Sequence, residues 1–237
     1  FWRPLTSNDR AADGEKMFGP WQDPTYTLVS LTTEKVKDPN TQRTEVCVTA
    51  QYALKAQRLH LAITYTLNEQ GTLQVSQKVT PHDATAQPKV LRYGMTLQMP
   101  MAMSQSQYLG RGPEENYADR KASQFVGLYQ FDAAQAQCPY EPYQEWGNHC
   151  DVRRWCQTNA QGQGLEVSSA ATFSASAHAS AKPVSAINLN IDLKQSGVNE
   201  MTNVGQYPEM INDTRVLLHE QTFTFCLTPI GVTSEKQ

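Results

Sequence analysis

The chain carries little charge of either sign and has no long hydrophobic run. Charged residues make up 18% of its 237 positions, and the formal net charge is −3. Lysine and arginine do not gather in a run, which is the pattern that a nucleic-acid or anionic-membrane surface requires. No apolar stretch approaches the roughly 20 residues needed to cross a bilayer. We therefore expect neither a nucleic-acid partner nor a membrane partner.

Cysteine is also scarce, with five in the whole chain. That number is too small for a disulfide framework at this length, and an odd count leaves at least one thiol free. Cys138, Cys150 and Cys156 lie close together in the sequence, beside His149. Their spacing matches no zinc motif. Ordinary thiols, or one disulfide in an exported protein, are therefore favoured over a metal site.

The first ten residues, FWRPLTSNDR, contain neither a starting methionine nor a signal peptide. A chain that opens on Phe-Trp is expected to be a piece of a longer protein. Its length is enough for one large β-domain or two small ones, with a sizeable core. Nothing in the sequence indicates a cellular compartment.

What the sequence does contain is period-two alternation, which is typical of half-buried strands. In residues 59–67 the apolar positions Leu59, Leu61 and Ile63 alternate with others, and the pattern resumes at 73–79 after the turn NEQG. These two segments predict a β-hairpin. Further strands are expected at residues 25–35, 44–54, 90–99, 165–174, 186–193 and 221–227.

Helical periodicity is weak by comparison. The best candidates, residues 120–129 and 174–182, are both short. Many antiparallel strands with one apolar face each indicate two sheets packed face to face. The predicted fold class is all-β, a large antiparallel sandwich with bigger sheets than an immunoglobulin domain uses.

The unusual residues fall between these strands, in segments 1–24, 109–120, 139–155 and 197–208. Polar and aromatic residues concentrated in loops on a rigid β-scaffold are typical of a ligand-binding face. Long caps that are packed by their own side chains would explain the same composition equally well.

The stretch YLGRGPEENYADRK, residues 108–121, is the densest of these loops. Gly110 and Gly112 allow backbone conformations closed to other residues, and Pro113 restrains the residue before it. Asp119 and Arg120 can pair with each other or with a neighbouring loop, which would lock the loop. We favour this structural interpretation over one in which Glu114, Glu115 and Asn116 bind sugar or metal.

The second dense loop reads YEPYQEWGNHCDVRRW, residues 140–155. Flat aromatic faces beside groups that form hydrogen bonds suit a carbohydrate, whose rings have apolar faces and hydroxyl edges. The aromatic residues are Tyr140, Tyr143, Trp146 and Trp155, and the polar ones are Gln144, Glu145, Asn148, His149 and Arg153. A packed loop, with His149 as an ordinary buried histidine, is the alternative.

The residues do not by themselves form a recognisable active site. Glycoside hydrolysis needs two carboxylates across the scissile bond, and nothing in the spacing of the loop glutamates forces such a pair. No nucleophile elbow, phosphate-binding loop or dinucleotide fingerprint is present. The sequence alone therefore indicates a large β-sandwich with a polar and aromatic loop face suited to sugar.

Four motifs resemble the C-terminal domain of the large β-galactosidases of glycoside hydrolase family 2. In chain order they are FWRPLTSND (1–9), LGRGPEENYADRKAS (109–123), QEWGNHCDVRRW (144–155) and INLNIDLKQSGV (187–198). Together they extend over nearly the whole chain, and the second and third are specific. The resemblance implies one domain, residues 1–237, which begins inside the family's domain without its first strands.

The resemblance also implies a fold and a context. The fold is the β-supersandwich shared with galactose mutarotases, and the domain helps to form the wall of the active site. The catalytic acid and nucleophile, with magnesium and sodium ions, belong to a TIM barrel absent here, so this chain itself needs no cofactor. The implied partners are that barrel and a β-galactoside or related glycan. The implied source is bacterial, with periplasm and cytoplasm both open.

Site residues follow from the matched motifs. The segment 10–19 is expected to be a mobile loop hinged at Gly14 and Gly19, and Val204 stands where the family stacks a tryptophan on the sugar. The residues expected near substrate are Asn8, Asp9, Gly14, Glu145, Asn148, His149 and Val204. Those expected to lock the loop are Gly110, Gly112, Pro113, Glu115, Tyr117, Asp119 and Arg120.

The missing tryptophan puts sugar stacking and galactose specificity in doubt. Two further interpretations of the whole chain remain open. One is a carbohydrate-binding module without catalysis, and the other is a mutarotase-like domain, which rests on fold analogy alone.

Overall fold

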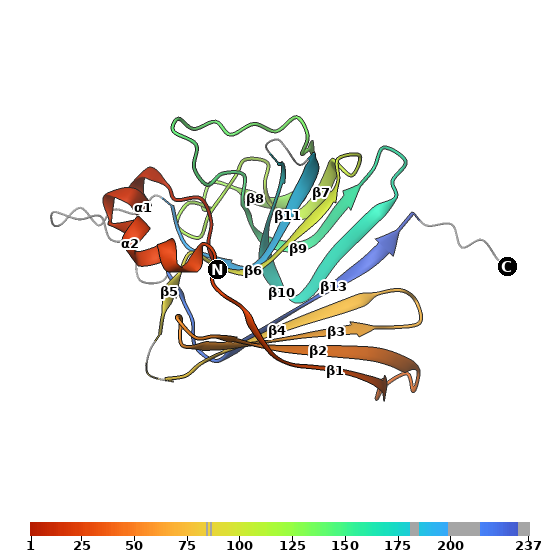
Figure 1. Ribbon diagram of the computed structural model, residues 1–237. Coiled ribbons are helices and arrows are strands. Elements are labelled where there is room, and N and C mark those ends of the chain that lie inside the picture. Colours follow the sequence, from red (N-terminus) through yellow and green to blue (C-terminus); the bar gives the residue numbers. More distant parts are fainter. Residues whose placement is uncertain (84, 86, 181–184, 199–213, 232–237) are drawn as a thin grey trace.

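The computed structural model describes residues 1–83, 85, 87–180, 185–198 and 214–231, and its strands form two layers (Figure 1). The helical elements are α1 (Ser7–Ala11), α2 (Gly14–Phe18) and the 3-10 helix η1 (Gly19–Trp21). The strands are β1 (Thr27–Lys37), β2 (Thr44–Leu54), β3 (Leu59–Leu67), β4 (Leu73–Pro81), β5 (Lys89–Val90), β6 (Arg92–Pro100), β7 (Gln105–Gly112), β8 (Phe125–Asp132), β9 (His149–Thr158), β10 (Gly164–Ala179), β11 (Ala186–Gln195), β12 (Val216–Leu217) and β13 (Gln221–Ile230).

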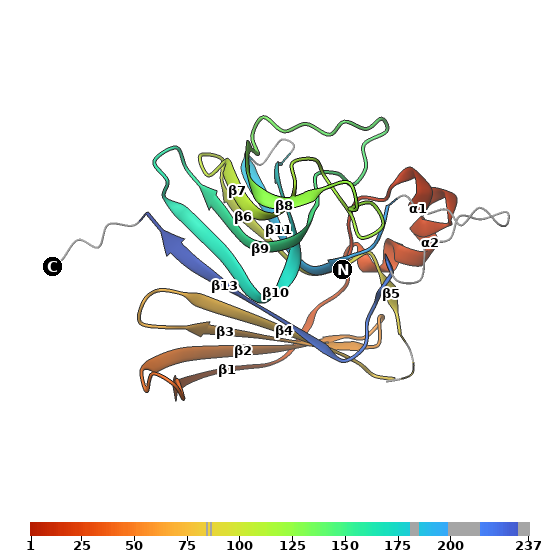
Figure 2. The same cartoon turned by 180° about the vertical axis from the view of Figure 1, so that it is seen from behind.

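The two layers belong to one hydrogen-bonded antiparallel sheet that folds over on itself. Its strand order is β1-β2-β3-β4-β13-β10-β9-β7-β8, with β11 paired to β10 and β6 paired to β11. The lower layer in Figures 1 and 2 contains β1 to β4 and β13, and the upper layer contains the other strands of this sheet. The all-β sandwich prediction is confirmed, but the expected two separate sheets are one.

Strand β10 is the reason that the two layers are continuous. It has 16 residues, and its first part, 164–168, pairs with β13 while its last part, 174–179, pairs with β11. The pairing with β9 shifts register between Ser168 and Phe173. Because such irregularities bend a strand and increase its twist, β10 can leave one layer and continue in the other.

The predicted hairpin of β3 and β4 is confirmed. Leu67 pairs with Leu73, and the side chain of Asn68 accepts hydrogen bonds from the backbone N–H groups of Gln70 and Thr72, each at 3.0 Å. Gly71 completes the turn with a φ of +81°. An asparagine that satisfies turn amides and a glycine at positive φ are what a tight connection between strands needs.

The core lies between the layers. Its fully buried members include Leu59 and Val75 from the lower layer and Trp155, Phe173 and Ile187 from the upper layer. They come from strands that direct apolar side chains between the layers, whereas the edge strands β1 and β8 contain no fully buried residue. Burial of this apolar surface provides the main favourable term in folding.

Three local expectations are corrected by the structure. Residues 125–132 form β8 on the edge beside β7, and residues 174–179 continue β10, so neither predicted helix is present. Pairing with a neighbouring strand outweighs weak helical propensity. Segment 10–19, expected as a loop, instead contains the end of α1 and all of α2.

Among the described residues no helix is long and apolar enough to span a bilayer.

Candidate functional site

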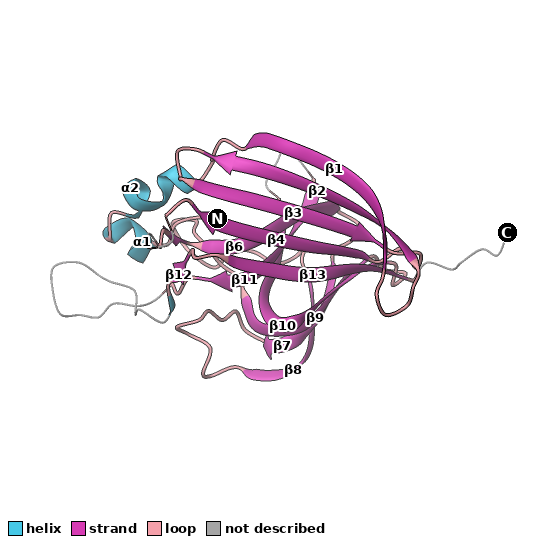
Figure 3. Cartoon of the chain, turned by 90° about the horizontal axis from the view of Figure 1, so that it is seen from below, coloured by secondary structure: helices cyan, strands magenta, loops and turns pink. Residues whose placement is uncertain are grey.

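Four of the loop segments singled out in the sequence meet around the helical end of the sandwich. Figure 3 shows α1 and α2 together at this end, beyond the ends of the long strands. The backbone N–H of Ser7 donates to Gln144 Oε1 at 2.8 Å, which joins the N-terminal segment to the second dense loop. Asn8 Nδ2 donates to the carbonyl of Val198 at 2.8 Å, which joins it to the chain after β11.

Arg3 is the centre of this assembly and has an exposed fraction of 0%. Its guanidinium donates to the carbonyl oxygens of Ser196 and Gly197, each at 2.9 Å, and to Asp9 Oδ2 at 3.3 Å. Asp9 also caps α1 in a reciprocal pair with Thr6. A buried arginine that satisfies a carboxylate and two carbonyls fixes the N-terminal segment and the chain after β11 in one geometry.

Glu145 ties the second dense loop to the end of β11. Its carboxylate accepts a hydrogen bond from Gln195 Nε2 at 2.8 Å, and the side chain is buried. Burial raises the pKa of Glu145, and the positive charge of Arg3 opposes that shift in part. The hydrogen bond from Gln195 thus holds the Glu145 carboxyl group in place and ties the loop to the end of β11.

Glu115 joins the two dense loops to each other. It accepts hydrogen bonds from Arg120 Nη2 at 2.5 Å, from the backbone N–H of Gly147 at 2.5 Å, and from the hydroxyl of Tyr140. The predicted pairing of Arg120 with a loop carboxylate is confirmed, with Glu115 as the partner. The guanidinium also lies 5.5 Å from the ring centroid of Tyr117. The side chain of Asp119, the other candidate partner, packs against the α-carbon of Gly197.

Removal of the Arg120 charge is expected to cost about 1–2 kcal/mol of unfolding free energy. The Arg120 side chain is 35% exposed and that of Glu115 is 18% exposed, so solvent screens the pair more than a fully buried one. Denaturation of an Arg120→Met variant measures the loss. Arg154→Met, whose pair with Glu166 is 56% exposed on the arginine side, is the matched control. Equal losses in the two variants would show that the loop is ordinary solvated surface.

Asn116 and Asn148 interlock the same two loops from inside. The backbone N–H of Asn116 donates to the carbonyl of Asn148 at 2.7 Å, and Asn148 Nδ2 donates back to the carbonyl of Asn116 at 2.8 Å. Asn116 Oδ1 accepts from the N–H of Cys150 at 2.8 Å. Both asparagines are buried. The structure thus places Asn148 within the framework that holds the loops.

Gly110 and Gly112 are the two glycines of β7, and both allow neighbouring side chains to lie close to the strand. Neither has a positive φ, so the expected need for unusual backbone conformations is wrong. A β-carbon at Gly112 would lie 2.3 Å from the hydroxyl of Tyr108 and 2.8 Å from the ring of Tyr129. Glycine is required because aromatic side chains lie directly over the strand. Pro113 follows as an exposed residue.

His149 is a packed histidine on β9. Its Nδ1 lies 3.0 Å from the Tyr108 hydroxyl and 3.3 Å from the carbonyl of Arg111. Burial lowers its pKa to about 4, so the ring is neutral at pH 7. Trp155 is fully buried next to Tyr108. The expected aromatic platform of Tyr143, Trp146 and Trp155 is therefore not formed, because a strand position directs Trp155 into the core.

A small cavity of about 80 Å³ lies where the loops meet. Its walls join residues expected near substrate, Asn8 and Glu145, to residues expected to lock the loop, Tyr117 and Arg120. Ligand pockets typically measure about 300–1,000 Å³, so this cavity is too small for a sugar ring. Buried Tyr117 Oη and Arg120 Nε lack a hydrogen-bond partner within the described part of the chain.

The remaining predicted residues are placed as follows. Gly14 begins α2, and a β-carbon there would lie 2.4 Å from the carbonyl oxygen of Asp9, so the helices pack closely. Val204 lies outside the described residues, as does the rest of segment 199–208.

All five cysteines are free thiols. Within the described ranges no group of three His, Cys, Asp or Glu side chains is placed to hold a metal ion.

Sequence reasoning missed two residues of the site. Arg3 lies in the stretch FWRPL, where an arginine among apolar residues is itself a signal of a buried, paired charge. Gln195 carried no such signal, because its role depends on Glu145 arriving from a distant loop.

A comparison with known protein families identifies the family to which the chain belongs. Residues 1–227 match the family described as beta galactosidase small chain. The chain belongs to this β-galactosidase small-chain family. Every segment of the Arg3 assembly lies within the matched residues.

Curated relatives of this small chain are β-galactosidases. The enzyme of Priestia megaterium (strain DSM 319 / IMG 1521) is 29% identical over 247 aligned residues, which include 97% of this chain and 23% of the relative. That of Lactobacillus delbrueckii subsp. bulgaricus is 31% identical over 168 residues, 70% of this chain and 16% of the relative. The small chain thus spans less than a quarter of the length of these relatives.

Solved structures give more distant likenesses. The GH36 α-galactosidase AgaA of Geobacillus stearothermophilus superposes with a TM-score of 0.49 and 13% identity, over 87% of this chain and 28% of that one. A galactose mutarotase related enzyme of Lactobacillus acidophilus gives a TM-score of 0.32 and 9% identity, over 92% and 75% of the two chains.

Proposed function

We propose that this chain is the non-catalytic sandwich domain of a glycoside hydrolase family 2 β-galactosidase. Its helical end would pack against a catalytic TIM barrel and complete the wall of the active site. The observation that carries the proposal is the Arg3 assembly, which holds four loop segments at one end around a cavity too small for sugar. Such a surface needs a second body to become a substrate site.

The carboxylates at this end support a role in shaping the wall. Asp9 is paired with Arg3, Glu115 with Arg120, and Glu145 with Gln195. A retaining glycosidase needs one carboxylate free to attack and another free to protonate the leaving group. Under the proposal both belong to the barrel, together with its magnesium and sodium ions, and no residue of this chain is assigned to those ions.

The isolated chain is expected to show no turnover of a chromogenic β-galactoside. The physical reason is that each carboxylate above is held by its own partner. The assay compares the chain with its Glu145→Gln variant and with a Tyr143→Phe variant, which alters an exposed residue. Turnover that disappears only in Glu145→Gln would overturn the proposal and make the domain an enzyme.

Addition of the missing body is the positive test. The Priestia megaterium enzyme, truncated to remove the region that this chain matches, is expected to be inactive and to regain hydrolysis when the 237-residue chain is added. Activity of the truncated enzyme without any added chain would count against a wall-forming role. Arg3→Met in the added chain should reduce the recovery, because that substitution loosens the loop segments at the proposed interface.

A further inference from the structure

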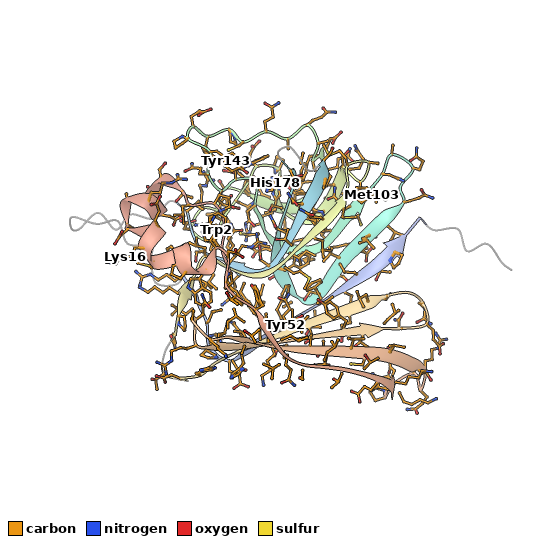
Figure 4. All side chains as sticks on the ribbon, viewed as in Figure 1. Trp2, Lys16, Tyr52, Met103, Tyr143 and His178 are labelled. Carbon is orange, nitrogen blue, oxygen red and sulfur yellow. The ribbon has the colours of Figure 1, made fainter. Side chains whose placement is uncertain are left out.

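The strand order of the sheet begins with β1 and ends with β8, so each has one edge without a partner among the described strands. β1 lies in the lower layer beside Tyr52 of β2, whereas the loop after β8, which carries Tyr143, lies above the upper layer (Figure 4). Figure 3 shows β1 and β8 on opposite sides of the molecule. Because an edge strand presents unpaired backbone N–H and C=O groups, each edge can accept a strand from another chain.

The edge at β1 is protected against such pairing. β1 exposes apolar residues such as Leu31, but its second half also carries Glu34, Lys35 and Lys37. Its register with β2 is interrupted near its start. Charges and bulges on an edge strand discourage pairing with other chains, so β1 has the features of an edge that stays free.

The edge at β8 has none of these features. Its sequence FVGLYQFD contains no proline and no charge before Asp132, and its register with β7 is continuous over all eight residues. It is also apolar, since Phe125 is 77% exposed and Leu128 is 68% exposed. Val126 and the β7 partner of Leu128, Leu109, are exposed beside them. An apolar edge without protection indicates that another strand covers it.

The residues of β8 match those of a second copy of the same strand. Antiparallel pairing about a two-fold axis at Leu128 places this residue opposite Leu128 of the second copy, where directly opposed side chains contact each other. Leu128 already pairs with Leu109 inside each chain. The joined sheets would therefore carry one row of four leucines on the same face.

The other residues of the strand fit the same register. Counted outward from Leu128, Phe125 lies opposite Phe131 of the second copy, so an exposed aromatic ring meets another aromatic ring. Asp132, the one charged residue of β8, lies opposite Gln124. Like charges directly opposite each other destabilise a pair of strands, and this register places none together within β8. The strand is thus self-complementary in apolar surface and in charge.

We infer that β8 pairs with β8 of a second copy of this chain and joins the two upper layers into one continuous sheet. The inference goes beyond the wall-forming role, because it needs no catalytic barrel and uses no residue of the Arg3 assembly. An edge of eight residues is smaller than a standard interface, which buries about 800 Å² on each partner. The dimer is therefore weak, with a dissociation constant on the order of 10–100 µM.

The test is sedimentation velocity of the full 237-residue chain between about 1 and 500 µM, a range that includes the expected constant. Reductant is present because all five cysteines are free thiols. The unmodified chain is expected to shift from monomer to dimer. Leu128→Lys should weaken the dimer at least about tenfold, because two lysines would then lie opposite each other. Leu31→Lys, at a leucine that is 61% exposed on the other edge, is the matched control and should dimerise as the unmodified chain does.

A second pair of substitutions tests the register. Val126 lies opposite Gln130 of the second copy, so a chain that carries both Val126→Glu and Gln130→Lys would form two opposite-charge pairs across the axis. This double variant should dimerise more tightly than either single variant. Circular dichroism shows whether each variant keeps its strands, and the double variant decides the matter if Leu128→Lys fails to fold.

Three results would overturn the inference. The first is a chain that remains monomeric up to about 500 µM, well above the expected constant, which would assign the edge to another part of the enzyme. The second is equal weakening by Leu128→Lys and Leu31→Lys, or a double variant no tighter than its singles. The third is growth beyond the dimer, because a two-fold contact closes on itself. None of these changes the hydrolysis tests, which measure recovery of activity with the catalytic part.

Discussion

Replacement of Arg3 with methionine is expected to lower the free energy of unfolding by about 3–5 kcal/mol, the usual cost of breaking a buried ion pair from one side. Arg3 is fully buried, and its loss leaves the Asp9 carboxylate without its ion-pair partner and the carbonyls of Ser196 and Gly197 without the guanidinium donor. Methionine preserves most of the apolar stem, so the loss reports the hydrogen bonds and the charge. Urea denaturation measures it, as a lower midpoint at unchanged slope.

The matched control is Arg43→Met, because the Arg43 side chain is 56% exposed and lies 4.0 Å from Glu69. That change should stay within about 0.5 kcal/mol, as is typical for exposed pairs. An Arg3→Met, Asp9→Asn double variant should be less destabilised than the sum of its singles, since the unpaired charge is removed. Strict additivity, or a loss for Arg3→Met as small as that of the control, would contradict the central position given to Arg3.

Acidification is expected to destabilise the fold between about pH 6.5 and pH 4. His149 and His178 have pKa values lowered to about 4 by burial, against an ordinary value of 6.5. The unfolded chain therefore binds more protons in this range, and stability falls as the pH falls. A shift of this size corresponds to about 3 kcal/mol for each histidine.

Two buried carboxyl groups act in the opposite direction. Burial raises the pKa of Glu145 and of Asp192, so the folded state takes up protons on them first and gains stability as the pH falls through their folded pKa values. The histidine effect is therefore isolated as a difference between variants. His149→Asn and His178→Asn should each flatten the pH dependence of unfolding free energy between pH 6.5 and 4. Profiles parallel to that of the unmodified chain would show that the two rings are not buried in neutral form.

The strands and the fold class follow from the sequence because alternation is a local property. Period-two spacing in residues 59–67 and 73–79 identifies one buried face for each strand, and the Asn68–Gly71 turn closes the hairpin. The same alternation places core residues such as Leu59, Val75 and Ile187 without reference to any other part of the chain. The loop motifs, read as a resemblance, also indicated a β-galactosidase region, and the match to the β-galactosidase small-chain family confirms that part of the expectation.

Hydrogen-bond and ion-pair partners that come from distant loops could not be predicted from local sequence patterns. Arg120 could have paired with Asp119 or with a glutamate, and the folded loops select Glu115 by bringing Tyr140 and Gly147 to the same carboxylate. Trp155 looked like a sugar platform until its strand position directed it into the core.

By itself, then, the sequence determined an all-β sandwich, its hairpin and the loop segments that carry its polar chemistry, because each depends on neighbours within a few residues. Only the tertiary structure decided that the two layers are one sheet, since that depends on where β10 bends between β13 and β11. It also decided that Arg3 is the buried centre of the loop end. The physical reason is that periodicity specifies which face of a strand is buried, whereas hydrogen-bond partners 100 or more residues apart in the chain, such as Arg3 and Ser196, are specified only by the packed fold.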